Sequence, residues 1–109
     1  MKHKITLPQL KKYDITQKVI QALADAESRA IIFSIINKGK TASELSAKLK
    51  IPLSSVYKKL SDLENLTLIE IEKTALSENG KRFKIYKSRI NKAEILIKKP
   101  DPTLSLSAN

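Results

Sequence analysis

The stretch KIPLSSVYKKLSDLENL, from Lys50 to Leu66, carries the strongest fold signal in this chain of 109 residues. At about 100° per residue, Val56, Leu60 and Leu63 fall on one side of a helix. The other side carries hydroxyls, an amide and charges, namely Ser54, Ser55, Lys58, Ser61, Asp62 and Asn65. The pattern predicts an amphipathic helix over about 53–66. Its polar side is either an ordinary solvated face or a surface that reads a partner, and the neighbouring residues must decide.

A second, shorter helix is predicted directly before this one. Thr41 and Glu44 have the spacing of a capping box and open the segment TASELSAKL. Pro52 ends that segment and suits the start of the next helix. Because only residues 50–52 separate the two helices, they must cross steeply, which is the helix-turn-helix arrangement.

Two helices are predicted upstream. Asp14 and Gln17 resemble a capping box for a helix that runs to about Ala24, and Asp25 can cap the next. In that next helix AIIFSII is apolar at six of seven positions, so it either lies at the centre of the core or buries one side against another chain. Phe33 is the candidate for a dimer contact, and covering of the first helix is the alternative.

After Leu66 the hydrophobic period changes from that of a helix to that of strands. Residues 68–73 and 82–88 alternate apolar and polar side chains, and Asn79-Gly80 between them is a hairpin turn signal. A third alternation, over 92–98, is expected to pair beyond this hairpin. Together the elements predict an α+β, mostly helical winged helix-turn-helix fold with a three- to four-helix core, a hairpin wing and an extra strand.

The domain boundaries follow from composition. Residues 1–13 are basic and contain Pro8, so a flexible amino-terminal arm is expected. The winged helix-turn-helix domain is assigned to 14–98. The tail 99–109 has two prolines and then small polar residues, which predicts disorder.

The segment from about Leu23 to Ile90, with IPLSSVYKKL and ENGKRFKIYKSRI, resembles the winged helix-turn-helix domains of ArsR-like, archaeal-type transcription regulators. The resemblance implies that the recognition helix lies in the major groove and the wing, about 74–82, on the flanking backbone or minor groove. The recognition-helix positions are Ser54, Ser55, Tyr57 and Lys58, and the wing-tip positions are Lys81 and Arg82.

This chain departs from that family in three respects. The family commonly has a glycine where this chain has Thr67. Many members dimerise through a helix after the wing, whereas here the amino-terminal helix with Phe33, or the last strand, would have to serve. Metal-sensing members need cysteine or clustered histidine, but this chain has no cysteine and a single histidine, His3.

Positive charge is concentrated in the wing and beyond it. The net charge is +10, and residues 79–99 contain eight basic residues against one acid. Lys81 and Arg82 flank the turn, and strand alternation places Lys84 on an exposed face. Lysines on a strand edge also prevent aggregation, which is the alternative reading for Lys92 and Lys98.

These features predict a sequence-specific regulator that binds double-stranded DNA as a homodimer. The alternative is a winged-helix module for protein–protein interaction in a transcription or replication assembly. RNA binding ranks third, because stacking aromatics are few. No carboxylate pair, activated nucleophile or glycine-rich phosphate loop is found, so an enzyme and a cofactor are not expected. No apolar run is long enough to span a membrane, and a cytoplasmic, nucleoid-associated protein is expected.

Overall fold

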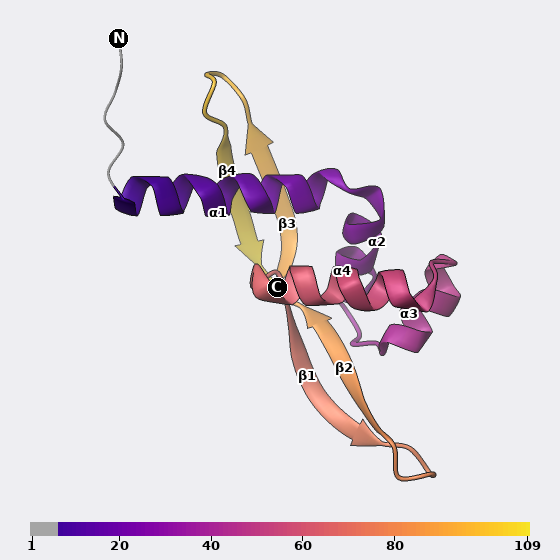
Figure 1. Ribbon diagram of the computed structural model, residues 1–109. Helices are drawn as coiled ribbons and strands as arrows, with labels where there is room; N and C mark the ends of the chain where they lie inside the picture. The colour runs from indigo at the N-terminus through magenta and orange to yellow at the C-terminus, as the bar shows by residue number, and fades with distance from the viewer. Residues whose placement is uncertain (1–6) are drawn as a thin grey trace.

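The computed structural model describes the backbone of residues 7–109 and the side chains of 15–109. Residues 1–6, including His3, lie outside the described residues. Over residues 7–109 there are four helices and then four strands: α1 (Leu7–Ala24), α2 (Ala26–Ser34), α3 (Ala42–Leu49), α4 (Leu53–Asn65), β1 (Ile69–Leu76), β2 (Arg82–Ser88), β3 (Ile90–Leu96) and β4 (Thr103–Ala108). β1 pairs with β2 and β3 with β4, both antiparallel, and the two hairpins project in opposite directions from the helices (Figure 1). The predicted α+β winged-helix fold is confirmed.

A single apolar core holds the helices against the bases of the hairpins. The side chains with almost no exposed surface are Ile31, Ile32, Ile35, Leu45, Val56, Leu60, Leu63, Leu68 and Ile69. The wide apolar stripe of α2 is therefore explained by its central position in the core. Phe33 is the exception on this helix, with 43% of its surface exposed.

Side-chain caps fix the starts of α2 and α3 as the sequence predicted. The carboxylate of Asp25 accepts a hydrogen bond from the Ser28 amide at 3.0 Å. At α3, the Thr41 hydroxyl accepts from the Glu44 amide and the Glu44 carboxylate accepts from the Thr41 amide, both at 3.1 Å. These reciprocal bonds satisfy amides that the helix itself leaves unpaired.

The end of α4 uses a conformation that is unusual for its residue. Thr67 has φ 59°, in the left-handed region that a glycine adopts without strain. The Thr67 amide donates to the Glu64 carbonyl and the Leu68 amide to the Leu63 carbonyl, which together form a Schellman motif. The turn after α4 therefore has the Schellman geometry that a glycine commonly provides, although Thr67 occupies this position.

The wing is the β1–β2 hairpin. Gly80 has φ 75° at the predicted turn, and the Ser77 amide donates to the Lys81 carbonyl at 2.8 Å. At the base of the wing, Lys40 pairs with Tyr86 through two backbone hydrogen bonds of 3.0 and 2.9 Å. The segment that leads into α3 is therefore tied to β2, which fixes the wing beside the helix-turn-helix unit.

The structure corrects the predicted amino-terminal boundary. Helix α1 begins at Leu7, so residues 7–13 are helical and do not form the expected flexible arm. Pro8 is compatible with this, because an amide in the first turn has no intrahelical partner to lose. The predicted start at Asp14 lies inside the helix. Helix α2 also ends earlier than expected, at Ser34.

The predictions for the last strand and the tail were also wrong in part. β3 does form, but it pairs with β4 and not with the wing. Residues 103–108, expected to be disordered, form β4 because Leu104 and Leu106 alternate with serines and meet the apolar side of β3. The Asn109 side chain then donates to the carbonyls of Ile36 and Ser88, both at 2.9 Å, and ties the strand end to the body.

Candidate nucleic-acid interface

Helix α4 packs its apolar side on the core and exposes its polar side to solvent. Val56, Leu60 and Leu63 hold it down, as the apolar stripe predicted. Of the predicted recognition residues, Ser54, Tyr57 and Lys58 are exposed and Ser55 is half-buried. Helix α4 has no side-chain cap, so the first-turn amides next to these residues have no side-chain partner.

An ion pair fixes the flank of α4 that faces α1 and α2. The Lys59 ammonium lies 2.7 Å from the Asp25 carboxylate, and the same oxygen of Asp25 accepts from the Ser28 hydroxyl and amide. Hydrogen bonds from Lys59 and then Ser28 lower the pKa of Asp25 to about 2, and the bond to Asp25 raises the pKa of Lys59. Lys59 therefore orients the helix, whereas Lys58 beside it points away from the body.

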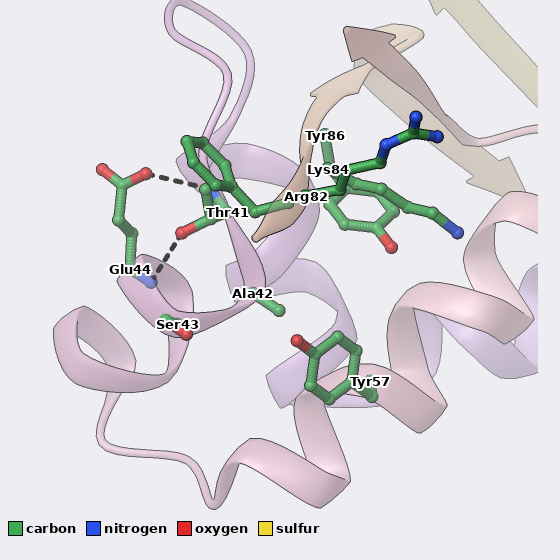
Figure 2. Close-up of a pocket in the computed structure, with 9 residues that line it drawn as sticks. Thr41, Ala42, Ser43, Glu44, Tyr57, Arg82, Lys84 and Tyr86 are labelled. Carbon is green, nitrogen blue, oxygen red and sulfur yellow. Dashed lines mark hydrogen bonds between the residues drawn. The ribbon is translucent and has the colours of Figure 1, made fainter. Parts of the chain in front are cut away.

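A groove of about 550 Å³ separates α4 from the wing. Its wall on the α4 side is Tyr57, and its other walls come from the start of α3 and from β2 (Figure 2). It is lined by Thr41, Ala42, Ser43, Glu44, Tyr57, Arg82, Phe83, Lys84 and Tyr86. Figure 2 shows the side chains of Arg82 and Lys84 extending from β2 above the ring of Tyr86.

Four cations of α4 and the wing have no acidic partner in the described part of the chain, and two of them, Arg82 and Lys84, line the groove. Among residues 15–109, none of Lys58, Lys81, Arg82 and Lys84 has an acidic partner within 4.0 Å. Three of the basic residues after them do have one: Lys87 with Glu72, Arg89 with Glu70 and Lys92 with Glu94. Among the unpaired cations of the wing, Lys81 thus lies at the tip, and Arg82 and Lys84 lie on the groove side of β2.

Two titratable groups, Tyr86 and Glu44, line the groove and differ in charge at neutral pH. Burial raises the pKa of Tyr86, so its hydroxyl stays protonated at neutral pH and can donate a hydrogen bond. The hydrogen bond from the Thr41 amide lowers the pKa of Glu44, whose carboxylate is engaged in the cap of α3.

The structure brings only some of the predicted site residues together. Tyr57, Arg82 and Lys84 share the groove, whereas Ser54, Ser55 and Lys58 lie along α4 outside its lining and Lys81 lies at the wing tip. Phe33, on α2, is not part of this site.

Sequence reasoning missed the contributions of Ser43 and Tyr86 to the groove. Ser43 lies two residues after the capping Thr41, so its place in the first turn of α3 was a usable signal. No pattern in the sequence pointed to Tyr86, because its position in the groove depends on the backbone pairing with Lys40.

Other kinds of site find little support in the part of the chain that the structure describes. Within it, no three His, Cys, Asp or Glu side chains gather in a way that could hold a metal ion. No helix described there is both long and apolar enough to cross a membrane.

A helix-turn-helix followed by a hairpin wing, with a groove between the second helix and the wing, defines the winged helix-turn-helix class of fold. The chain is similar to the crystal structure of NolR from Sinorhizobium fredii, with a TM-score of 0.61 over 80% of this chain and 81% of that chain. The two sequences are 17% identical, so the similarity establishes the fold. No family model and no curated protein sequence matches the chain.

Proposed function

We propose that this protein is a sequence-specific, double-stranded DNA-binding transcription regulator of ArsR-like type. Helix α4 enters the major groove with Ser54, Ser55, Tyr57 and Lys58, and the wing lies on the flanking backbone or minor groove with Lys81, Arg82 and Lys84. The archaeal-type resemblance of the recognition helix, the homodimeric state and a cytoplasmic, nucleoid-associated location belong to the same proposal.

One observation carries this proposal: the unpaired cations Arg82 and Lys84 line the same groove as Tyr57, which lies on the exposed side of α4 beside the polar residues Ser54 and Lys58. Phosphate contacts need unpaired cations, while base edges need short side chains that donate or accept hydrogen bonds. The first half of α4 supplies the short polar side chains for base edges. β2 and the wing tip supply the unpaired cations for phosphates. If acidic side chains neutralised Lys58, Arg82 and Lys84, this surface would not favour the binding of a polyanion such as DNA.

Selection of bound sequences from a random pool of duplex DNA tests the proposal. A specific regulator enriches one motif, and a symmetric motif indicates binding as a dimer. Lys58→Ala is then expected to reduce discrimination between the motif and a scrambled duplex by about 1–3 kcal/mol if Lys58 contacts a base. Lys98→Ala, a charge change outside the groove, is the matched control. Absence of enrichment, together with no duplex binding at low salt, would contradict the proposal.

A protein-interaction module remains the second candidate, and the exposure of Phe33 is the observation in its favour. The neighbouring Ile31, Ile32 and Ile35 are fully buried, so Phe33 is the large apolar side chain of this stripe that is exposed. Phe33→Asp should therefore leave the fold intact. If this variant loses function in the cell while it still binds the selected duplex as the unmodified protein does, the second candidate gains support over the first.

A further inference from the structure

The β3–β4 hairpin exposes more large apolar side chains than any other part of the described chain. Ile95, Leu96, Ile97 and Leu106 all have at least 40% of their surface exposed, and Ile97 reaches 72%. From the two strands, Ala93 and Leu104 pack half-buried against the core. Because a sheet of two strands is only marginally stable in water and just part of this hairpin packs on the core, a further strand at its edge is expected to stabilise it.

The two faces of the hairpin differ in chemistry. Ala93 lies opposite Leu106 and Ile95 opposite Leu104, so these four side chains share one apolar face. The other face carries Lys92 opposite Ser107 and Glu94 opposite Ser105, followed by Leu96 opposite Thr103 at its end. Any strand that extends this sheet must continue the apolar face with apolar residues and the polar face with polar ones.

Both strands have an unpaired outer edge. Within residues 7–109, β3 and β4 pair only with each other. Free edges usually pair or are protected by charge. β4 is uncharged between Thr103 and Ala108, whereas β3 carries one cation, Lys92, and one anion, Glu94, two positions apart on the same face. The β3 edge therefore carries both members of a charge pair.

We propose that the outer edge of β3 pairs antiparallel with β3 of a second copy of this chain, which forms a four-stranded sheet across a two-fold axis. Residues that face each other in an antiparallel pair point to the same side of the sheet. The apolar face is therefore continuous only when odd-numbered residues of β3 face odd-numbered residues of the second copy.

Charge selects one register among those that satisfy this condition. With Ala93 opposite Ala93 of the second copy, Lys92 lies opposite Glu94 of the second copy, and the reverse pair forms by symmetry. A shift in one direction places two Lys92 side chains opposite each other, and a shift in the other direction places two Glu94 side chains opposite each other. Like charges directly opposite are destabilising, so of these three registers the one centred on Ala93 is favoured.

Reversal of single charges tests this interface on the full chain without DNA, so its outcome is independent of the proposed DNA binding. The unmodified protein is expected to be a dimer in sedimentation equilibrium. Lys92→Glu and Glu94→Lys should each weaken the dimer at least about tenfold, because each replaces two attractive pairs by two repulsive ones. An equimolar mixture of the two single variants should form a mixed dimer, since the acidic strand of one then faces the basic strand of the other.

The double variant Lys92→Glu with Glu94→Lys should dimerise like the unmodified protein. Lys98→Glu, which makes the same charge change as Lys92→Glu outside the strand, should remain a dimer and is the matched control. Circular dichroism checks that each variant is folded, which is expected because Lys92 and Glu94 are exposed and their ion pair of 2.7 Å lies within one chain. The proposal is overturned if the unmodified protein is monomeric, if the single variants dimerise normally, or if the folded single variants stay monomeric when mixed.

Discussion

Thr67 occupies a backbone conformation that its β-branched side chain disfavours, and the whole exit turn of α4 depends on it. Its φ of 59° permits the two hydrogen bonds that close the helix. A residue with a Cβ in this region costs about 1–2 kcal/mol relative to glycine. The Thr67 hydroxyl donates to the Leu66 carbonyl at 2.6 Å, a local bond on an exposed residue that offsets little of this cost.

We therefore expect Thr67→Gly to stabilise the protein by about 1 kcal/mol. The free energy of unfolding in urea, followed by circular dichroism, measures the change. Thr67→Ala keeps the Cβ and removes the hydroxyl, so it should bring no gain and serves as the control. Equal stability of the glycine and alanine variants would show that the conformation of this residue is not strained.

Asp25 joins the start of α2 to the flank of α4, which makes stability depend on its charge. Its pKa falls from 3.8 to about 2 on folding, mainly through the hydrogen bond from Lys59. A carboxyl whose pKa is lowered by folding contributes stability above its unfolded pKa and loses it as the pH falls through the folded value. Asp25→Ala should thus cost about 1 kcal/mol at pH 7 through the lost cap.

The pH dependence separates this role from a general packing effect. The stability difference between the unmodified protein and Asp25→Ala should stay constant above about pH 5 and shrink between pH 3.8 and about 2. Glu27→Ala is the control, since Glu27 lies farther from Lys59, at 3.7 Å, and caps no helix. A difference that does not change over this range would argue against the charged cap.

At the scale of the element, the wing should contribute affinity and little sequence discrimination. Lys81 and Arg82 have no acidic partner among the described residues, so each can neutralise one phosphate. Each such contact contributes about 0.9 to the slope of log affinity against log salt concentration, so Lys81→Ala with Arg82→Ala should reduce the slope by about 2.

Fluorescence anisotropy on one duplex over a range of salt concentrations measures that slope. Lys98→Ala with Lys99→Ala removes the same charge from the β3–β4 loop and should leave the slope nearly unchanged. If both double variants reduce the slope equally, the effect comes from net charge and not from a contact of the wing.

Elements with strong local signals could be predicted from the sequence, whereas elements defined by distant partners could not. The stripe of Val56, Leu60 and Leu63 and the cap at Thr41 are local, and both helices form where they were expected. β4 was missed because Leu104 and Leu106 form a weak pattern whose meaning depends on β3. The groove was only partly predictable for the same reason: Tyr57 and Lys84 were identified separately, but their common site results from the pairing of Lys40 with Tyr86.

At the scale of the whole molecule, the wing meets the helical body through a close approach at Gly39. A Cβ at this position would lie 2.6 Å from Cγ2 of Ile85 and 3.1 Å from the Tyr86 carbonyl oxygen. The loop before α3 can thus lie flat against β2 only because Gly39 has no side chain. The neighbouring Lys40 then forms its two backbone bonds with Tyr86.

Gly39→Ala should accordingly destabilise the protein by about 1–3 kcal/mol, because the loop or β2 must shift. Thermal unfolding measures the loss, and duplex affinity measures whether the wing has moved relative to α4. Lys38→Ala, at the adjacent exposed position, is the control for a change in this loop without a clash. A Gly39→Ala variant as stable as the unmodified protein would show that the loop yields without cost.

The junction between the two hairpins has a mechanical consequence. β2 ends at Ser88 and β3 begins at Ile90, so a single residue separates the strand that carries Arg82 and Lys84 from the strand that carries Lys92 and Glu94. The buried Ser88 hydroxyl bonds to the carbonyl and the amide of Ile90, and the Arg89 amide bonds to the Leu68 carbonyl. We therefore expect residues 82–96 to move together about their anchor in the core, so that a contact made by β3 would also influence the direction in which the wing points.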